Sequence, residues 1–178
     1  MVSERSATLQ RSLASARNVK ELEMAPWRIG AALVGIVLVL IYAGGANYWN
    51  RQDGWYDALL KPSWQPPGFV FGIIWPYNFV VIGIALYMLA SQAKPIWVFA
   101  ALLLFGASVF FALRWSYLFY SLHDLKAAAL SLLTTAILTL PLLAITFAHS
   151  IKIGLAMIPY QIWIFTAAAL NFNFLANN

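Results

Sequence analysis

The chain has 178 residues, of which 62% are hydrophobic and only 10% are charged. A soluble domain carries about 25% charged residues, so this composition excludes a water-soluble globule and fits a single domain whose surface mostly faces lipid. The net charge is +5 and there is no cysteine, which excludes disulfides, thiolate catalysis and cysteine-based metal sites. The aromatic residues lie inside apolar runs rather than on a basic face, so no nucleic-acid partner is expected.

Residues 1–26 form a basic N-terminal segment that differs from the rest of the chain. Its basic side chains are spread through Ser, Ala and Leu, at Arg5, Arg11, Arg17 and Lys20. Apolar residues recur between them at helical spacing, which predicts an amphipathic helix on the membrane surface. An Arg- and Ser-rich targeting peptide is the alternative interpretation.

Residues 27–178 contain five apolar stretches, each long enough to cross a bilayer as a helix. A hydrocarbon core about 30 Å thick needs roughly 20 apolar residues, whereas barrel strands are about 10 residues long with alternating polarity. The fold class expected is therefore an all-α membrane protein, a five-transmembrane-helix bundle. The predicted spans are residues 27–49, 67–90, 95–119, 124–148 and 151–174.

Small residues spaced four apart mark one face of two of these spans. They are Ala31 and Gly35 in the first span, and Ala127, Ser131 and Thr135 in the fourth. Such spacing lets helices approach closely. The two faces predict seams inside the bundle or between the protomers of a homodimer.

The single long connection, residues 50–66, joins the first two spans and is rich in tryptophan and proline. Proline fixes φ and removes a hydrogen-bond donor, so this connection is stiff. A stiff, aromatic loop suits a lid over a site. Tryptophan is also common as an anchor at the membrane interface, and the residues alone leave both interpretations open.

Arg114 is a charged residue inside the third span, where charges are rare and face protein, water or headgroups. It lies five residues before the expected end of that span, or about 7.5 Å, so its side chain could snorkel to the interface. The alternative is a carboxylate partner, because arginine binds carboxylates through two parallel hydrogen bonds. The candidate carboxylates are Asp53, Asp57, Asp124 and a ligand propionate.

Lysine and arginine divide unevenly between the two sides of the membrane. The side of the N-terminus carries Arg28, Lys94 and Lys152 besides the N-terminal segment, and the other side carries Arg51, Lys61 and Lys126. The positive-inside rule places the N-terminus in the cytoplasm or matrix. The long connection and the C-terminus are then expected on the opposite side.

Two motifs resemble the translocator-protein family, whose members are also called tryptophan-rich sensory proteins. The run WYDALLKPSWQPPGFVFGIIW is similar to the family's W-Y-x-x-L-x-K-P-x-W-x-P-P signature and the G-x-x-W that follows it. Near the C-terminus, PYQIWIFTAAALNF resembles P-Y-x-x-W-x-x-F/T-x-x-x-L-N-Y. The similarity covers roughly residues 27–174. The matching positions are Trp55, Lys61, Pro62, Trp64, Pro66, Pro67, Gly72, Trp75, Pro159, Tyr160, Trp163, Leu170 and Asn171.

Three places depart from the family pattern. Phe79 stands where the second helix of the family has tyrosine, and the third span keeps only Trp115 of an expected N-W-x-W-P-P. The proposed cholesterol motif needs a tyrosine and then a basic residue, but Phe172 and Ala176 occupy those places. That motif is a weak pattern even when intact, so cholesterol recognition is poorly supported.

The resemblance implies an apolar pocket beneath the long connection that in the family binds porphyrins and related tetrapyrroles, sterols and benzodiazepine-type drugs. Its wall is expected to contain four tryptophans, with Arg114 near the mouth; the alternative for each tryptophan is core packing or lipid contact. The implied ligand-binding residues are Trp55, Lys61, Pro62, Trp64, Pro66, Pro67, Trp75, Phe79, Arg114, Trp115, Trp163 and Asn171, of which Trp64, Trp75, Trp115 and Trp163 form the wall.

Two functions follow as hypotheses. The first is an integral membrane protein that holds a flat hydrophobic ligand without a covalent bond: a porphyrin or haem-like tetrapyrrole, a sterol-like molecule or a lipid. The second is a structural accessory subunit of a larger membrane complex, for example respiratory or photosynthetic, that keeps the fold without the ligand. Neither catalytic nor metal-ligating residues are expected, and only tryptophan-dependent photochemical breakdown of porphyrins stays open as an activity. Membrane lipids, the small ligand and either a second copy or other subunits are the expected partners.

Overall fold

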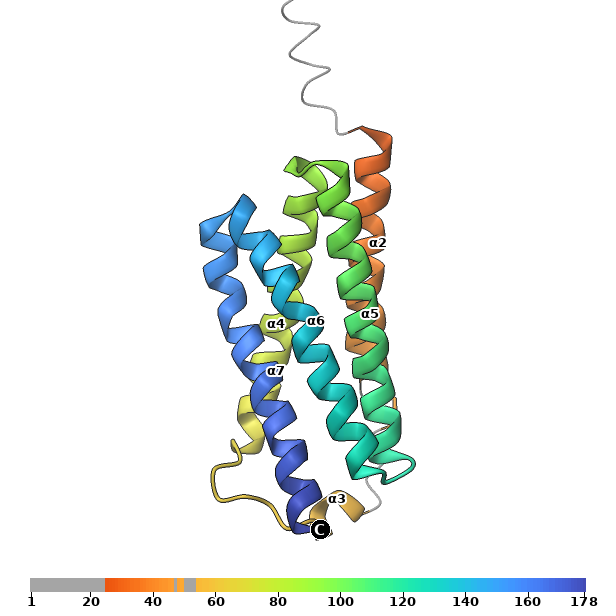
Figure 1. Cartoon of the computed structure of the whole chain (residues 1–178), viewed down its shortest axis with the longest axis vertical. Coiled ribbons are helices and arrows are strands. Elements are labelled where there is room, and N and C mark those ends of the chain that lie inside the picture. The colour runs from red at the N-terminus through yellow and green to blue at the C-terminus, as the bar shows by residue number, and fades with distance from the viewer. Residues whose placement is uncertain (1–24, 47, 50–53) are drawn as a thin grey trace, which may run out of the picture.

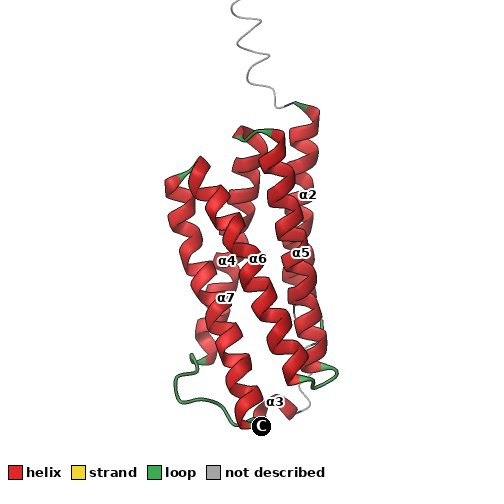
Figure 2. Cartoon of the chain, viewed as in Figure 1, coloured by secondary structure: helices red, strands yellow, loops and turns green. Residues whose placement is uncertain are grey.

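The computed structural model describes residues 25–46, 48–49 and 54–178, and within them all regular secondary structure is helical. Five long helices run side by side, each long and apolar enough to cross a membrane, as Figures 1 and 2 show. The predicted five-helix membrane bundle is therefore confirmed. The long helices are α2 (Pro26–Gly45), α4 (Gly68–Gln92), α5 (Pro95–Tyr120), α6 (Leu125–His149) and α7 (Ile151–Asn177), and a short helix, α3 (Trp55–Ala58), precedes α4.

The helix starts follow local chemistry. Pro26 and Pro95 occupy the first turns of α2 and α5, where the missing N–H of proline costs nothing. Asp124 caps α6 by accepting a hydrogen bond from the backbone N–H of Ala127 at 2.9 Å. Ser150 both ends α6 and caps α7. These caps explain why the short connections between the last helices could be located closely from the sequence.

The long helices form an antiparallel bundle in which α6 packs between α5 and α7, while α2 packs on α4 and α5. The helix α4 also contacts α7, which closes the bundle. The short helix α3 and the end of α7 lie at the same end of the molecule, below the bundle in Figure 1. We call residues 54–67, which contain α3, the lid.

The two small-residue faces lie inside the bundle. A Cβ atom on Gly35 would meet the Cβ of Leu86 at 3.1 Å, which is tight for such a contact, so glycine suits the close crossing of α2 and α4. In α6, the buried Thr135 donates a hydrogen bond to the carbonyl of Ser108 in α5 at 3.4 Å. The seams predicted from four-residue spacing therefore hold helices of one chain together.

The predicted surface helix over residues 1–26 lies almost entirely outside the described residues and stays a prediction. The first predicted span reached residue 49, but α2 ends at Gly45. Likewise, α7 continues past residue 174 to Asn177. These are shifts of one turn or less at helix ends, where assignments are least sharp.

Replacing Gly35 by valine is expected to destabilise the bundle by about 1–3 kcal/mol, because the added methyl groups overpack the crossing with Leu86. Gly30 in the same helix is the matched control, since its Cβ would meet nothing within 4 Å. Unfolding of both variants in one detergent would measure the difference. Equal loss of stability in Gly35→Val and Gly30→Val would contradict the close crossing of α2 and α4.

Candidate ligand-binding site

A cavity of about 630 Å³ lies between α4, α5 and α7, under the lid. This volume is typical of small-molecule sites, which are mostly apolar with a few polar groups. The lid contributes Tyr56 and Gln65, and the end of α2 contributes Ala46. The aromatic side chains of the lining are Tyr56, Phe71, Trp75, Phe79, Trp115, Phe119, Tyr120, Trp163 and Phe174.

The inner wall contains a stacked aromatic pair on α4. The rings of Trp75 and Phe79 lie 5.7 Å apart with planes inclined by only 24°. Tyr42 of α2, which is almost fully buried, presses its ring edge against both, at 5.8 and 5.3 Å. Because α2 fixes this pair from behind, the pair presents a rigid flat surface to the cavity.

Two polar atoms at the cavity have no hydrogen-bond partner among the described residues. One is the indole N–H of Trp163, whose ring is held edge-on to Phe71 at 4.9 Å. The other is the side-chain carbonyl of Gln65. Leaving buried polar groups unpaired is costly, and both atoms belong to residues that line the cavity.

Trp115 and Asn171 form a polar link across the wall between α5 and α7. The indole N–H of Trp115 donates to the side-chain carbonyl of Asn171 at 2.8 Å. The amide NH₂ of Asn171 in turn donates to the carbonyl of Ala167 at 2.9 Å. Both residues line the cavity, but they satisfy each other, so their polar atoms hold the wall in place.

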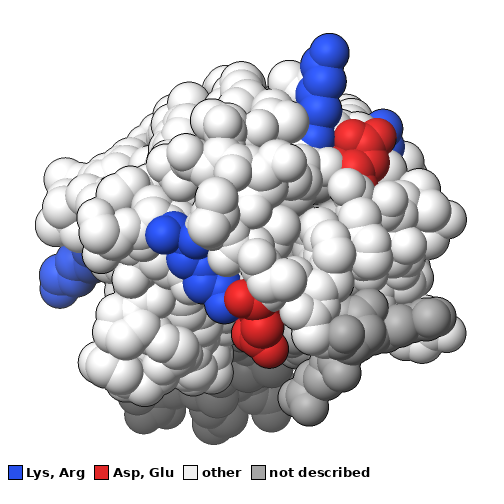
Figure 3. Space-filling model, turned by 90° about the horizontal axis from the view of Figure 1, so that it is seen from below, with Lys and Arg blue, Asp and Glu red and all other residues white. Residues whose placement is uncertain are grey.

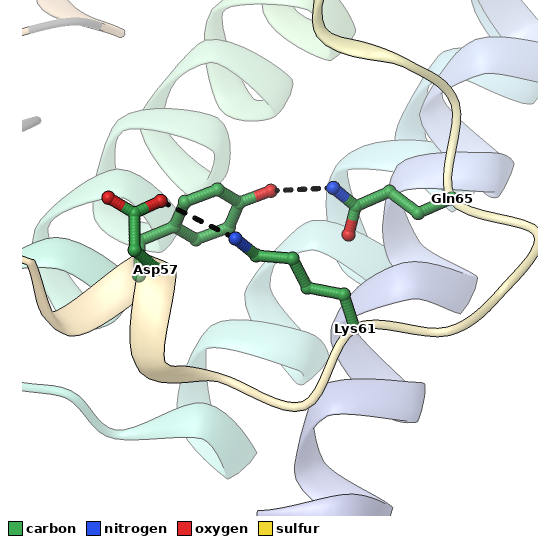
Figure 4. A network of polar contacts seen from close by, with 4 residues as sticks. Asp57, Lys61 and Gln65 are labelled. Atoms are coloured by element: carbon green, nitrogen blue, oxygen red, sulfur yellow. Dashed lines mark hydrogen bonds and ion pairs between the residues drawn. The ribbon is translucent and has the colours of Figure 1, made fainter.

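The lid is held by contacts among its own residues and by a link to the end of α7. The side chain of Gln65 donates to the hydroxyl of Tyr56 at 3.1 Å, and the ammonium of Lys61 lies 4.6 Å from the ring centroid of Tyr56 and 3.4 Å from Asp57, as Figure 4 shows. Asn178 accepts a hydrogen bond from the backbone N–H of Leu60 at 2.8 Å. The lid therefore roofs the cavity as one stiff unit.

A ring stack ties the start of the lid to the connection between α5 and α6. Trp55 lies parallel to His123, with ring centroids 4.0 Å apart, and touches Phe119 edge-on at 5.0 Å. His123 adopts a positive φ of 55°, which a histidine tolerates better than most residues. This backbone conformation places its ring over Trp55.

Of the predicted site residues, five line the cavity: Trp75, Phe79, Trp115, Trp163 and Asn171. Six others belong to the lid without lining the cavity: Trp55, Lys61, Pro62, Trp64, Pro66 and Pro67. Their role in binding stays a prediction; they form part of the lid that covers the cavity. Arg114 belongs to neither group.

The structure corrects the predicted place of Trp64, which was expected in the pocket wall. Its side chain is 48% exposed and borders a separate, shallow polar depression between the lid and the end of α7. The reason is local: Ser63 and Trp64 form a turn that is closed by a hydrogen bond from the backbone N–H of Gln65 to the carbonyl of Pro62 at 3.0 Å, and of these residues only Gln65 lines the cavity. Trp64 is therefore directed outward.

The structure also corrects the predicted place of Arg114 near the mouth. Its side chain is exposed and its guanidinium donates a hydrogen bond to the hydroxyl of Ser131 on α6. Successive residues of a helix are about 100° apart, so with Trp115 turned into the cavity, Arg114 points out of it. Within the described residues, Arg114 forms no ion pair with a carboxylate.

Tyr56 and Gln65, the two lid residues that reach the cavity, were not among the site residues predicted from the sequence. A signal for Tyr56 existed, because it is the second residue of the W-Y pair that begins the lid motif. Gln65 is a polar residue directly before the paired prolines. Nothing in its local pattern indicates which way it turns. In the part of the chain that the structure describes, no group of three or more metal-ligating side chains comes together.

Comparison with known proteins gives a consistent result. The model of a family described as the TspO/MBR family matches residues 31–176. The "Tryptophan-rich protein TspO" of Chlorobaculum tepidum is 29% identical over 150 residues, covering 83% of this chain and 94% of the relative. A "Tryptophan-rich sensory protein" of Cereibacter sphaeroides is 26% identical over 122 residues, covering 68% and 75%. The "Translocator protein" of Bos taurus is 27% identical over 167 residues, covering 86% and 92%.

Replacing Asn171 by leucine is expected to lower the free energy of unfolding by about 1–3 kcal/mol, because the indole N–H of Trp115 loses its acceptor. In a Trp115→Phe background the same change should cost less, and the coupling from this double-mutant cycle should be about 0.5–3 kcal/mol. Asn177→Ala, at the exposed end of α7, is the control. Additive effects of the first two changes would disprove the link.

Proposed function

The chain belongs to the TspO/MBR family, and from this premise we propose that it is a membrane binding protein that holds a flat hydrophobic ligand under the lid. Family membership, as predicted from the motifs, rests on a match over residues 31–176. Family membership and the five apolar helices together make the protein a multi-pass integral membrane protein. The binding of a ligand is what we propose beyond this.

The aromatic lining of the cavity is the observation that carries the proposal. The stacked pair of Trp75 and Phe79 offers a flat surface on one side, and Trp115 and Trp163 lie on the facing helices. Flat conjugated molecules stack on such rings with a gain beyond simple burial. A tetrapyrrole is the ligand class that best uses several ring faces at once, and its nitrogen or carboxylate acceptors suit the unpaired N–H of Trp163.

Among the described residues, the lining contains no lysine or arginine, and this narrows the mode of binding. Because Arg114 lies outside the cavity, it does not bind a propionate of the ligand in this proposal. A tetrapyrrole would then bind through its ring, with its carboxylates directed toward the mouth. A sterol-like or lipid ligand is the second choice, because its hydroxyl could donate to Gln65, whose side-chain carbonyl is unpaired.

A binding role also agrees with the names of two relatives, one called a sensory protein and the other a translocator protein. The alternative of an accessory subunit rested on the departures at Phe79 and in the third helix. Yet Phe79 keeps a stacked contact with Trp75, and Trp115 still links α5 to α7. The departures leave an aromatic cavity, so we favour ligand binding over a purely structural role.

Replacing Trp75 by alanine is expected to weaken protoporphyrin binding several-fold, because a stacking face worth about 0.5–1.5 kcal/mol is removed. Trp64→Ala is the matched control in the lid and should bind like the wild type, since Trp64 does not line the cavity. Titration of the Soret band in lipid nanodiscs would measure both affinities.

The same titration with the dimethyl ester of protoporphyrin tests the mode of binding. The acid and the ester should bind alike, because no cation of the described residues lines the cavity. A wild type that binds neither compound, or equal affinities in Trp75→Ala and Trp64→Ala, would reject the proposed site and favour the accessory-subunit hypothesis.

We propose that the N-terminus lies in the cytoplasm or matrix and that the lid lies on the opposite side. Lys94 follows α4 at the end of the bundle far from the lid (Figure 1), and Lys152 lies in the first turn of α7. Both support this orientation through the positive-inside rule. Reporter fusions after Lys94 and Lys152 should report the cytoplasm, and a fusion at the C-terminus the other side; a cytoplasmic C-terminus would reverse the assignment.

A further inference from the structure

Arg114 lies outside the lining of the cavity and forms no ion pair with the acidic residues that the structure describes. Its side chain is exposed, and its guanidinium donates to the hydroxyl of Ser131. Of those acidic residues, Asp57 lies 3.4 Å from Lys61 and Asp124 caps α6. Because a guanidinium has five N–H donors, most of them have no protein partner within the described residues.

The position of Arg114 along α5 places it near one boundary of the hydrocarbon core. The helix has 26 residues, or about 39 Å, against a core of about 30 Å. Arg114 precedes the end of α5 at Tyr120 by six residues, which is about 9 Å. With α5 centred in the bilayer, the Cα of Arg114 lies about 4–5 Å inside the boundary at the lid end.

Ser131 holds the guanidinium at this depth. It lies six residues after the start of α6 at Leu125, so the two residues stand at the same level of the antiparallel hairpin of α5 and α6. The hydrogen bond to Ser131 fixes the direction of one N–H and leaves the others free. The arrangement is a positioned cation at the edge of the hydrocarbon, where a charge requires a partner.

The surface around Arg114 is typical of contact with lipid. Phe110 and Tyr117 share its face of α5, at helical spacing of four and three residues, and are 62% and 41% exposed. Tyr117 lies near the helix end, as aromatic residues of the interface do. Lys126, exposed at the start of α6, brings a second positive charge to the same end of the hairpin. Figure 3 shows how sparse charged groups are on this end of the molecule.

We infer that Arg114, positioned by Ser131, binds the phosphate group of a phospholipid in the leaflet at the lid end. Phosphate oxygens match the planar fork of arginine in a bidentate geometry. Local thinning of the bilayer brings a headgroup to a charge placed this close to the boundary. Lys126 adds attraction for an anionic lipid. The site lies on the outside of α5 and α6 and is separate from the cavity.

The test compares lipids with and without a phosphate. The purified, delipidated protein is heated with phosphatidylglycerol, with diacylglycerol of the same chains, or with inorganic phosphate. Phosphatidylglycerol should raise the Tm of the wild type by several degrees, and the other two should not. The rise should vanish in Arg114→Gln and persist in Lys152→Gln, whose side chain is exposed at the opposite end.

Further variants separate the lipid from other partners of the same charge. Ser131→Ala should bind phosphatidylglycerol more weakly by native mass spectrometry, a readout that remains available if Arg114→Gln folds poorly. Protoporphyrin affinity should be the same in Arg114→Gln and the wild type. An equal Tm rise in Arg114→Gln and the wild type would overturn the inference. A second outcome would also overturn it: lipid has no effect, and another protein co-purifies with the wild type but not with Arg114→Gln. That result would assign Arg114 to a carboxylate partner.

Discussion

The constraint that governs this structure is that polar groups inside a bilayer find no water to bond. Backbone groups are satisfied by forming helices, and several hydroxyls of the spans donate to a carbonyl of their own helix, as Thr146 does to Leu142 at 2.9 Å. Longer side chains reach across helices: Gln161 of α7 donates to the carbonyl of Ala136 at 2.9 Å. Ser116 of α5 donates to the carbonyl of Ala46 at 2.9 Å. Internal pairing therefore fixes how the helices stand against one another.

Some buried polar groups stay without a partner among the described residues. The indole N–H of Trp163 and the side-chain carbonyl of Gln65 are two of them, and both residues line the cavity. By contrast, Trp115 and Asn171 line that cavity but are satisfied by each other. Outside the bundle, Arg114 has a single partner, Ser131, among the described residues. The hydrogen-bond partners of these side chains thus distinguish the proposed ligand site, a structural link and the proposed lipid-facing charge.

The connectivity explains why the lid lies over the cavity. The three connections after α4 are only a few residues long, so each can only join neighbouring ends of antiparallel helices. The connection from α2 to α4 is the exception, and it must cross the end of the bundle where α5 and α7 also end or connect (Figure 1). Tyr56 packs there on Phe119 and Phe174, each at 6.1 Å. The long connection therefore covers the cavity because it must run from the end of α2 to the start of α4.

The sequence by itself determined the elements: five spans, the long connection between the first two and the family of the chain. These depend on local hydrophobicity, on backbone chemistry and on short motifs, all of which are readable residue by residue. What it could not determine was which side chains meet. The spans are apolar around their whole circumference, so no polar face indicates the inside of the bundle. Only tertiary packing decided that Trp75 and Trp163 line the cavity and that Arg114 lies outside it, because one residue along a helix rotates a side chain by about 100°. In the lid, Tyr56 and Gln65 pack toward the cavity and Trp64 points outward.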